Sequence, residues 1–110
     1  MDKLEFKAFF YAIGDYSRFS ILKELAKNNL NVSEIVAMTG IEQSNVSHHM
    51  SCLLNCGFVS VRRKGKERVY AINPNVKQTV DSITSHIAAY KKRIISCNIA
   101  NRAYISKVIK

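Results

Sequence analysis

The sequence predicts a mainly α-helical fold with a small β-hairpin, the winged helix-turn-helix. Three observations predict it. Two helical patterns are joined by a tight turn at Gly40, a β-rich stretch with a charged turn follows them, and a long helical pattern begins after Pro74. A chain of 110 residues has room for one modest core, so we expect a single domain over residues 1–110.

The first two helices are predicted from their apolar residues and their ends. Residues 2–13 have an almost wholly apolar body, which indicates burial on more than one side, and Gly14 ends this helix. Asp15 can cap a second helix over 16–28, in which the apolar residues follow helical spacing.

The next two helices form the helix-turn-helix. Asn31 and Glu34 have the spacing of a capping box, which starts a short helix that Gly40 ends in the left-handed conformation. A longer helix begins near Gln43 and runs to Cys56, where a glycine again stops it.

Two short β-rich stretches come next, around Val59 and Tyr70. A charged segment that contains glycine separates them, which is typical of a hairpin. A hairpin directly after a helix-turn-helix is the wing of a winged-helix domain.

After Pro74 the apolar residues step by four and three positions, as in a heptad repeat. The stripe consists of Val76, Val80, Ile83, Ile87, Tyr90, Ile94 and Cys97. Asn101 interrupts it, and Tyr104 and Val108 resume it. We expect residues 74–110 to form a long C-terminal helix that makes the chain a homodimer.

The net charge of +9 is unevenly distributed, because residues 31–61 contain no lysine or arginine. Such a charge suits nucleic acid, an anionic membrane or an acidic partner, and does not choose among them. No apolar run approaches the roughly 20 residues of a membrane span, and residues 1–30 do not read as a secretory signal, so we expect a cytoplasmic protein. The sequence has no Gly-rich phosphate loop, paired carboxylates or recognisable catalytic arrangement, which argues against an enzyme.

The start of the longer helix carries short polar side chains, where a recognition helix meets base edges in the major groove. These candidate base contacts are Gln43, Ser44, Asn45, Ser47 and His48. The candidate phosphate contacts lie on the wing and are Arg62, Arg63, Lys64, Lys66 and Arg68. Any one of these residues could belong to a solvated face, but the ordered set predicts binding to duplex DNA. His49 is expected to be a packed, hydrogen-bonded core histidine instead.

Three cysteines are an odd number in a chain expected to be cytoplasmic, which argues against a disulfide framework. Cys52 and Cys56 are four residues apart on one helix face, and Cys97 is the third thiol. Three thiolates suit a soft cation such as Cd(II) or Pb(II), whereas zinc normally takes a fourth ligand. Free cysteine is also among the most buried residue types, and spacing alone favours a core role.

Three segments together resemble the ArsR/SmtB family of repressors, over about residues 4–73. They are Asp15-Tyr-Ser-Arg-Phe-Ser-Ile-Leu-Lys-Glu-Leu, Asn31-Val-Ser-Glu-Ile and Gln43-Ser-Asn-Val-Ser-His-His-Met. The resemblance implies a dimer that represses its own operon and leaves DNA when a metal or another inducer binds. The sequence departs from the family pattern at Tyr16, where proline is common, and at Glu42, where a capping serine is common.

The segment from Met50 to Val59 is similar to that of the CmtR-type cadmium and lead sensors within this family. This resemblance implies a metal site made by Cys52 and Cys56 with Cys97 of the other subunit, and makes As(III) less suitable. The family's site of Asp and His on the last helix is poorly matched, since only Asp81 and His86 are available. Its Cys-x-Cys box is absent from residues 28–36.

Two other interpretations stay open at this point. The inducer could act on the thiols by oxidation or persulfide formation in place of a metal. The chain could also be a constitutive architectural DNA binder without an inducer, which would bind without sequence preference.

Overall fold

The computed structural model describes residues 2–102. Its elements follow the order that the sequence predicts, with one additional strand and with the predicted C-terminal helix divided in two. They are α1 (Lys3–Ile13), α2 (Tyr16–Lys27), β1 (Leu30–Asn31), α3 (Val32–Thr39), α4 (Gln43–Asn55), β2 (Val59–Lys64), β3 (Glu67–Ile72), α5 (Pro74–Ala89) and α6 (Lys91–Ile95). The chain divides after Val80 into two compact units, so the expectation of a single domain stays a prediction. Within residues 2–102, no helix combines the length and hydropathy needed to cross a membrane.

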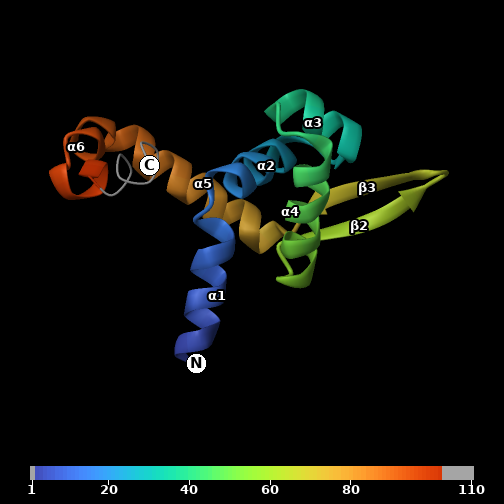
Figure 1. Cartoon of the computed structure of the whole chain (residues 1–110), viewed down its shortest axis with the longest axis horizontal. Coiled ribbons are helices and arrows are strands. Elements are labelled where there is room, and N and C mark those ends of the chain that lie inside the picture. The colour runs from blue at the N-terminus through green and yellow to red at the C-terminus, as the bar shows by residue number, and fades with distance from the viewer. Residues whose placement is uncertain (1, 103–110) are drawn as a thin grey trace. The chain divides into compact units, whose positions relative to one another are not determined.

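The first unit has a helical core to which the antiparallel sheet is attached, with the strand order β1-β3-β2. The hairpin of β2 and β3 extends away from α2, α3 and α4 (Figure 1). The core side chains that are almost completely buried come from α2, α3, α4 and the start of α5. They are Ile21, Leu22, Leu25, Ile35, Val46, Met50, Leu53 and Val80. This is a winged helix-turn-helix, as the sequence predicts.

The predicted helix ends are confirmed. The side chain of Asp15 accepts a hydrogen bond from the backbone N–H of Arg18 at the start of α2. Asn31 and Glu34 form both hydrogen bonds of the capping box, at 2.8 and 2.9 Å. Gly40 ends α3 with a φ of 73°, which side chains with a Cβ rarely adopt.

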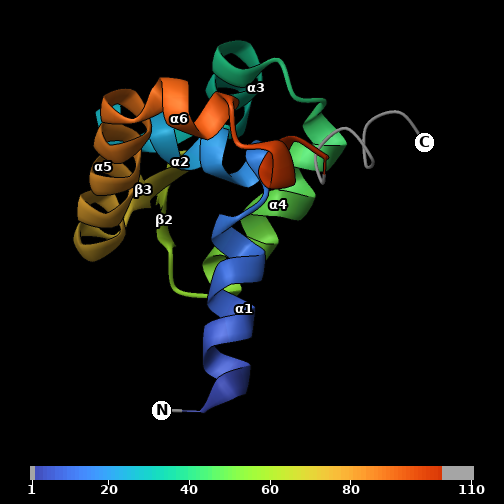
Figure 2. The ribbon, with the colours of Figure 1, turned by 90° about the vertical axis from the view of Figure 1, so that its left-hand side faces the viewer.

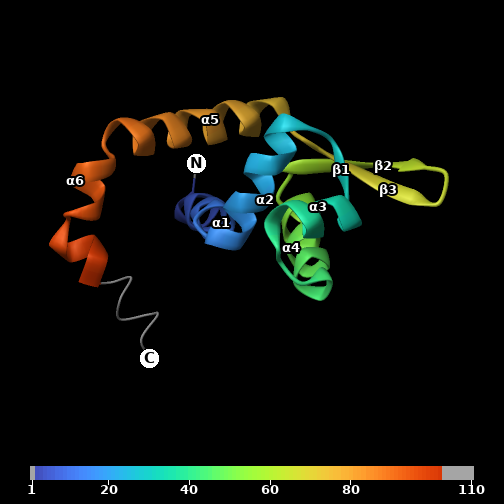
Figure 3. The same ribbon diagram turned by 90° about the horizontal axis from the view of Figure 1, so that it is seen from above.

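Strand β1 was not expected from the sequence. Leu30 lies opposite Tyr70, and Asn31 lies opposite Val69, so a third strand joins the hairpin at its base. Asn31 is therefore both the last residue of β1 and the N-cap of α3. This residue connects the base of the wing directly to the helix-turn-helix, whose helices α3 and α4 lie side by side (Figure 3).

In the single chain, α1 is less buried than the sequence predicts. Only Ala12 and Ile13 of α1 are buried, and Leu4, Phe6 and Phe10 are 71%, 50% and 61% exposed. The reason is that α1 packs against α2 through its C-terminal end. Its apolar body is left as an exposed surface, which is the kind of surface that a second subunit covers.

The prediction of one continuous C-terminal helix also needs correction. The helix α5 ends at Ala89, and α6 begins after Tyr90, whose φ and ψ are −115° and 22° (Figure 2). The heptad pattern identifies an apolar face, but it does not ensure that the helix is continuous. A helix is stabilised mainly by the packing of its apolar face, and this face is largely exposed in the single chain. Ile87, Tyr90 and Ile94 are 46%, 46% and 39% exposed. Tyr104 and Val108 lie outside the described residues.

Candidate nucleic-acid interface

The helix α4 separates a polar exposed side from an apolar buried side. All five candidate base contacts, from Gln43 to His48, are exposed, and Val46 between them is buried. Met50 and Leu53 continue the buried side at helical spacing. The side chains that anchor α4 in the core therefore do not compete with those that are available to a ligand.

The start of α4 lacks a side-chain cap. Glu42 occupies the N-cap position and makes no capping hydrogen bond; its carboxylate instead accepts one from the hydroxyl of Ser44, at 2.9 Å. An acidic side chain at a helix N-terminus is still favourable for the helix dipole. The departures from the family pattern at Glu42 and at Tyr16, which starts α2, leave both helices formed.

The five candidate phosphate contacts are all exposed, and the register of the hairpin divides the four that lie in its strands between its two faces. Directly opposite residues of an antiparallel pair project to the same face. Arg63 lies opposite Arg68, on the face of the sheet that carries the buried Val59 and Tyr70. The sequence identified these cations, but it could not give this register.

The other face of the hairpin has mixed charge. Arg62 lies opposite Val69, and Lys64 lies opposite Glu67. These residues line a hollow that also includes Glu34 and Arg63. Glu34 and Glu67 reduce the attraction of this hollow for phosphate, whereas Arg63 and Arg68 have no carboxylate opposite to them in the strand pair.

The second half of α4 carries a pair of neighbouring thiols. Cys52 is half-buried, and Cys56 is exposed at the C-cap position, one helical turn further along the chain. Partial desolvation raises the pKa of the Cys56 thiol above its usual value, and the charge and hydrogen bond of Cys52 raise this pKa further. Both thiols are thus accessible to a soft cation, which must displace the proton of Cys56 to bind.

Cys97 is also exposed, and it lies in the short segment between α6 and the helical residues 98–102. It belongs to the second compact unit, whereas the thiol pair of α4 belongs to the first. Among the described residues of this single chain, no three side chains of the metal-binding types gather into a site. The three-thiolate set stays a prediction.

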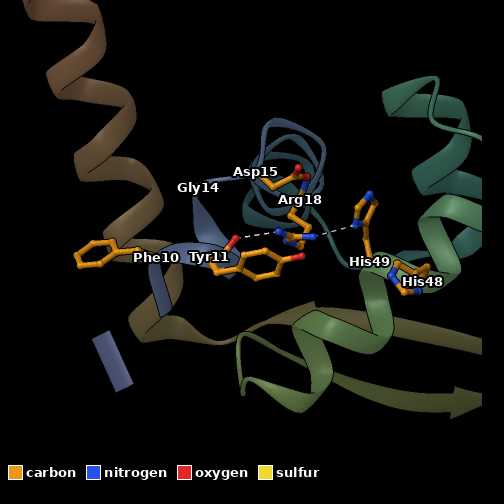
Figure 4. A pocket seen from close by; sticks show the side chains of 7 residues that line it. All are labelled: Phe10, Tyr11, Gly14, Asp15, Arg18, His48 and His49. Atoms are coloured by element: carbon orange, nitrogen blue, oxygen red, sulfur yellow. Dashed lines mark hydrogen bonds between the residues drawn. The ribbon is translucent and has the colours of Figure 1, made fainter. Parts of the chain in front are cut away.

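An exposed pocket lies where α1, α2 and α4 meet (Figure 4), and Phe10, Tyr11, Asp15 and His48 contribute to its lining. The guanidinium of Arg18 lies at its base and donates to the carbonyl oxygens of Tyr11 and Ala12. One of its terminal nitrogens, Nη1, is 3.4 Å from Nδ1 of His49. The predicted core histidine is therefore half-buried in the wall of this pocket, with a polar contact at one ring nitrogen.

Sequence reasoning assigned no role to Arg18. The available signal was its position in α2, since it shares the helical stripe of Leu22 and Leu25, which otherwise enters the core. A cation on a buried stripe needs hydrogen-bond partners, and this requirement was the indication that the residue has a special environment.

Comparison with known proteins decides the family. The family model described as "Bacterial regulatory protein, arsR family" matches residues 15–61. The chain is 34% identical to the transcriptional repressor SdpR of Bacillus subtilis, over 67% of this chain and 80% of that protein. The chain belongs to the ArsR family.

Other ArsR relatives are named for metals or as regulators. The "Probable mercury resistance operon repressor" of Streptomyces lividans is 40% identical over 66% of this chain and 58% of its own length. The regulator CmtR of Mycobacterium tuberculosis is 36% identical over 56% of this chain and 52% of its own length. The match thus spans little more than half the length of these two curated relatives.

The crystal structure of NolR from Sinorhizobium fredii superposes on this chain with a TM-score of 0.70 at 26% identity. The alignment covers 76% of this chain and 84% of NolR. The named relatives are regulators and not enzymes, in agreement with the expectation for this ArsR chain.

Proposed function

We propose that this chain is a transcriptional repressor that binds duplex operator DNA as a homodimer and releases it when a soft metal ion binds. The observation that carries the proposal is the combination in one unit of an exposed polar start of α4 with a cationic hairpin. Short polar side chains can read base edges while the wing holds the phosphates. We expect the protein to act in the cytoplasm, because its DNA target lies there.

The metal part of the proposal rests on the neighbouring thiols of α4. Cys52 lies in α4, the helix that would enter the groove, and Cys56 is the C-cap of the same helix. With Cys97 of the partner subunit they would supply three thiolates to Cd(II) or Pb(II). Metal binding would then pull α4 toward the other subunit and lower its affinity for DNA, which couples the two sites.

A thiol-redox inducer is the second candidate, and the position of the Cys52 and Cys56 thiols one helical turn apart is the observation that favours it. However, oxidants react with the thiolate, and the raised pKa of Cys56 keeps that thiol protonated at neutral pH. A cation with high affinity for sulfur can displace the same proton, and the raised pKa makes metal binding depend on pH without preventing it.

The test is a titration of the reduced protein with Cd(II) and Pb(II), followed by the ultraviolet absorption of the sulfur-to-metal bonds. Hg(II) serves as a comparison, because a similar protein is named for mercury resistance. We expect saturation at one metal per protomer in the wild type and a weaker band in Cys97→Ser. The control is Ser51→Ala, which changes a hydroxyl on the same helix and leaves every thiol in place.

The same proteins are then tested for DNA release. The probe is a labelled duplex that the wild-type chain has enriched from a random-sequence pool. Cd(II) or Pb(II) should dissociate the wild-type complex and leave the complex of the triple Cys→Ser variant intact. Release from that variant would refute the thiolate mechanism, and equal binding of all duplexes would favour a constitutive architectural protein.

A further inference from the structure

Arg18 is the only charged side chain that is buried among the described residues, with an exposed fraction of 7%. No carboxylate lies within ion-pair distance of its guanidinium in this part of the chain; Asp15 accepts a hydrogen bond only from its backbone N–H. Burying a charge is costly unless its hydrogen-bonding groups are satisfied. The partners of this guanidinium therefore explain why the arrangement is stable.

Two of these partners are at the end of α1. The Nε atom donates to the carbonyl oxygen of Ala12 at 2.7 Å, and Nη2 donates to that of Tyr11 at 2.8 Å. Carbonyls in the last turn of a helix have no partner within the helix, and they form the negative end of its dipole. The guanidinium also lies over the ring of Tyr11, 4.9 Å from its centre. Arg18, a residue of α2, thus caps the C-terminal end of α1.

The third partner is on α4. The Nη1 atom of Arg18 is 3.4 Å from Nδ1 of His49 (Figure 4). Arginine can only donate, so Nδ1 must accept, and the ring proton of a neutral His49 must then be on Nε2. The pKa of His49 is lowered, mainly by burial and further by the charges of Arg18 and His48, although Asp15 acts in the opposite direction. These effects favour the neutral ring that the contact requires.

We infer that Arg18 is a positioning residue for DNA recognition, because its guanidinium fixes α4 to the C-terminal end of α1 through His49. The inference rests on the proposed DNA-binding function. His48, the last candidate base contact, directly precedes His49 in α4. A single side chain therefore connects the reading helix to the helix whose apolar body is exposed for a second subunit. Because the guanidinium of Arg18 is planar and its donors point in fixed directions, it sets the orientation of α4 as well as the distance of α4 from α1.

The first test compares variants at both ends of the contact. Arg18→Lys keeps the positive charge but removes the planar guanidinium with its several donors. His49→Leu removes the acceptor on α4. His49→Gln keeps an acceptor, since an amide oxygen can accept from the guanidinium. Lys23→Gln is the matched control, because it removes an exposed cation from the same helix. Affinity is measured by fluorescence anisotropy on a duplex enriched by the wild type and on a random duplex, with melting temperatures for every protein.

We expect Arg18→Lys and His49→Leu to weaken binding to the enriched duplex by about tenfold, and His49→Gln and Lys23→Gln by less than about threefold. Binding to the random duplex should remain within about twofold for all variants, because the wing supplies the phosphate contacts. Equal losses on both duplexes, or losses that follow the melting temperature, would show a merely structural role and overturn the inference.

A second measurement does not involve DNA. Nitrogen NMR of the His49 ring in the whole chain should find the proton on Nε2, with an Nδ1 resonance that changes in Arg18→Lys. A proton on Nδ1 would overturn the inference whatever the DNA result. By contrast, a wild-type chain that enriches no duplex from the pool would refute the proposed function, and the ring measurement would still report on the contact itself.

Discussion

At the scale of single residues, partial burial has the same effect on two different side chains of α4. It lowers the pKa of His49 and raises the pKa of the Cys56 thiol, so in both cases the neutral form is favoured. Neutral His49 can accept from Arg18, and a protonated thiol exchanges its proton for a metal ion. The helix α4 contains no lysine, arginine or carboxylate, and the surroundings of His49 and Cys56 also favour their uncharged forms.

The lowered pKa of His49 predicts how stability depends on pH. The folded state binds the proton more weakly than the unfolded state, so its stability should be greatest above pH 6.5 and should fall as pH drops below that value. The fall should be small, under about 1 kcal/mol, because the ring is partly exposed to solvent. Thermal melts across this pH range should show it in the wild type.

His49→Gln should flatten this part of the pH profile, since glutamine does not titrate. His48→Gln is the control, because that side chain is exposed and lies next to it in the sequence. A profile that stays unchanged in His49→Gln would assign the acid sensitivity to another group.

At the scale of elements, the hairpin shows how register distributes charge. Two arginines that face each other across a strand pair repel, so Arg63 and Arg68 make the hairpin less stable when no anion is near. An approaching phosphate removes this repulsion. On the other face Lys64 already has Glu67 opposite to it. We therefore expect the two faces to contribute differently to DNA binding, although the sequence alone presents one run of cations.

This difference predicts the salt dependence of DNA binding. Arg63→Ala and Arg68→Ala should each weaken binding and reduce the slope of log affinity against log salt concentration by about 1. Lys64→Ala should change the slope less, because Glu67 already offsets that charge. The measurement is anisotropy with a fixed duplex over a series of salt concentrations. Equal changes in all three variants would mean that the register does not matter for phosphate binding.

At the scale of the whole molecule, each compact unit leaves apolar side chains exposed. In the first unit these side chains are in the body of α1, and in the second unit Ile87, Tyr90 and Ile94 carry the heptad stripe. Exposed apolar surface of this kind marks interaction sites in proteins that do not cross a membrane. A homodimer would bury both surfaces, and its twofold symmetry would match two DNA half-sites.

The exposed body of α1 predicts the effect of a charge there. Phe6→Glu should weaken the dimer by at least about tenfold, because it places a carboxylate in an apolar interface. Affinity for the enriched duplex should fall with it. Sedimentation velocity over a range of protein concentrations measures the association.

Tyr16→Glu is the matched control, since Tyr16 is an aromatic residue of α2 that is 86% exposed. It should leave the dimer intact. A wild type that sediments as a monomer at all concentrations, or an unchanged dimer in Phe6→Glu, would contradict the assignment of this surface.

The parts of the fold that depend on local chemistry were predictable from the sequence. The caps at Asp15 and Asn31, the stop at Gly40 and the polar start of α4 each depend on residues a few positions apart. The contact between Arg18 and His49 was not predictable, because it joins residues that are 31 positions apart and depends on how three helices meet.

Strand β1, the exposure of α1 and the helix break at Tyr90 were not predictable for related reasons. A strand as short as β1 has no periodicity of its own, and only its pairing with β3 defines it. An apolar stripe in a sequence does not indicate whether it packs against the same chain or against a second subunit. For this reason α1 was expected to be more buried than it is, and the break at Tyr90 was not foreseen.

The base and the tip of the wing have different support. Strand β1 pairs with β3 only at Tyr70 and Val69, so the segment from Arg63 to Arg68 is a ribbon of two strands. Such a ribbon is weakly held and twists more than a wider sheet. We expect changes of length or sequence in it to leave the base in register. The tip can therefore change how strongly it attracts an anionic partner, while α4 and its exposed polar side chains stay in place.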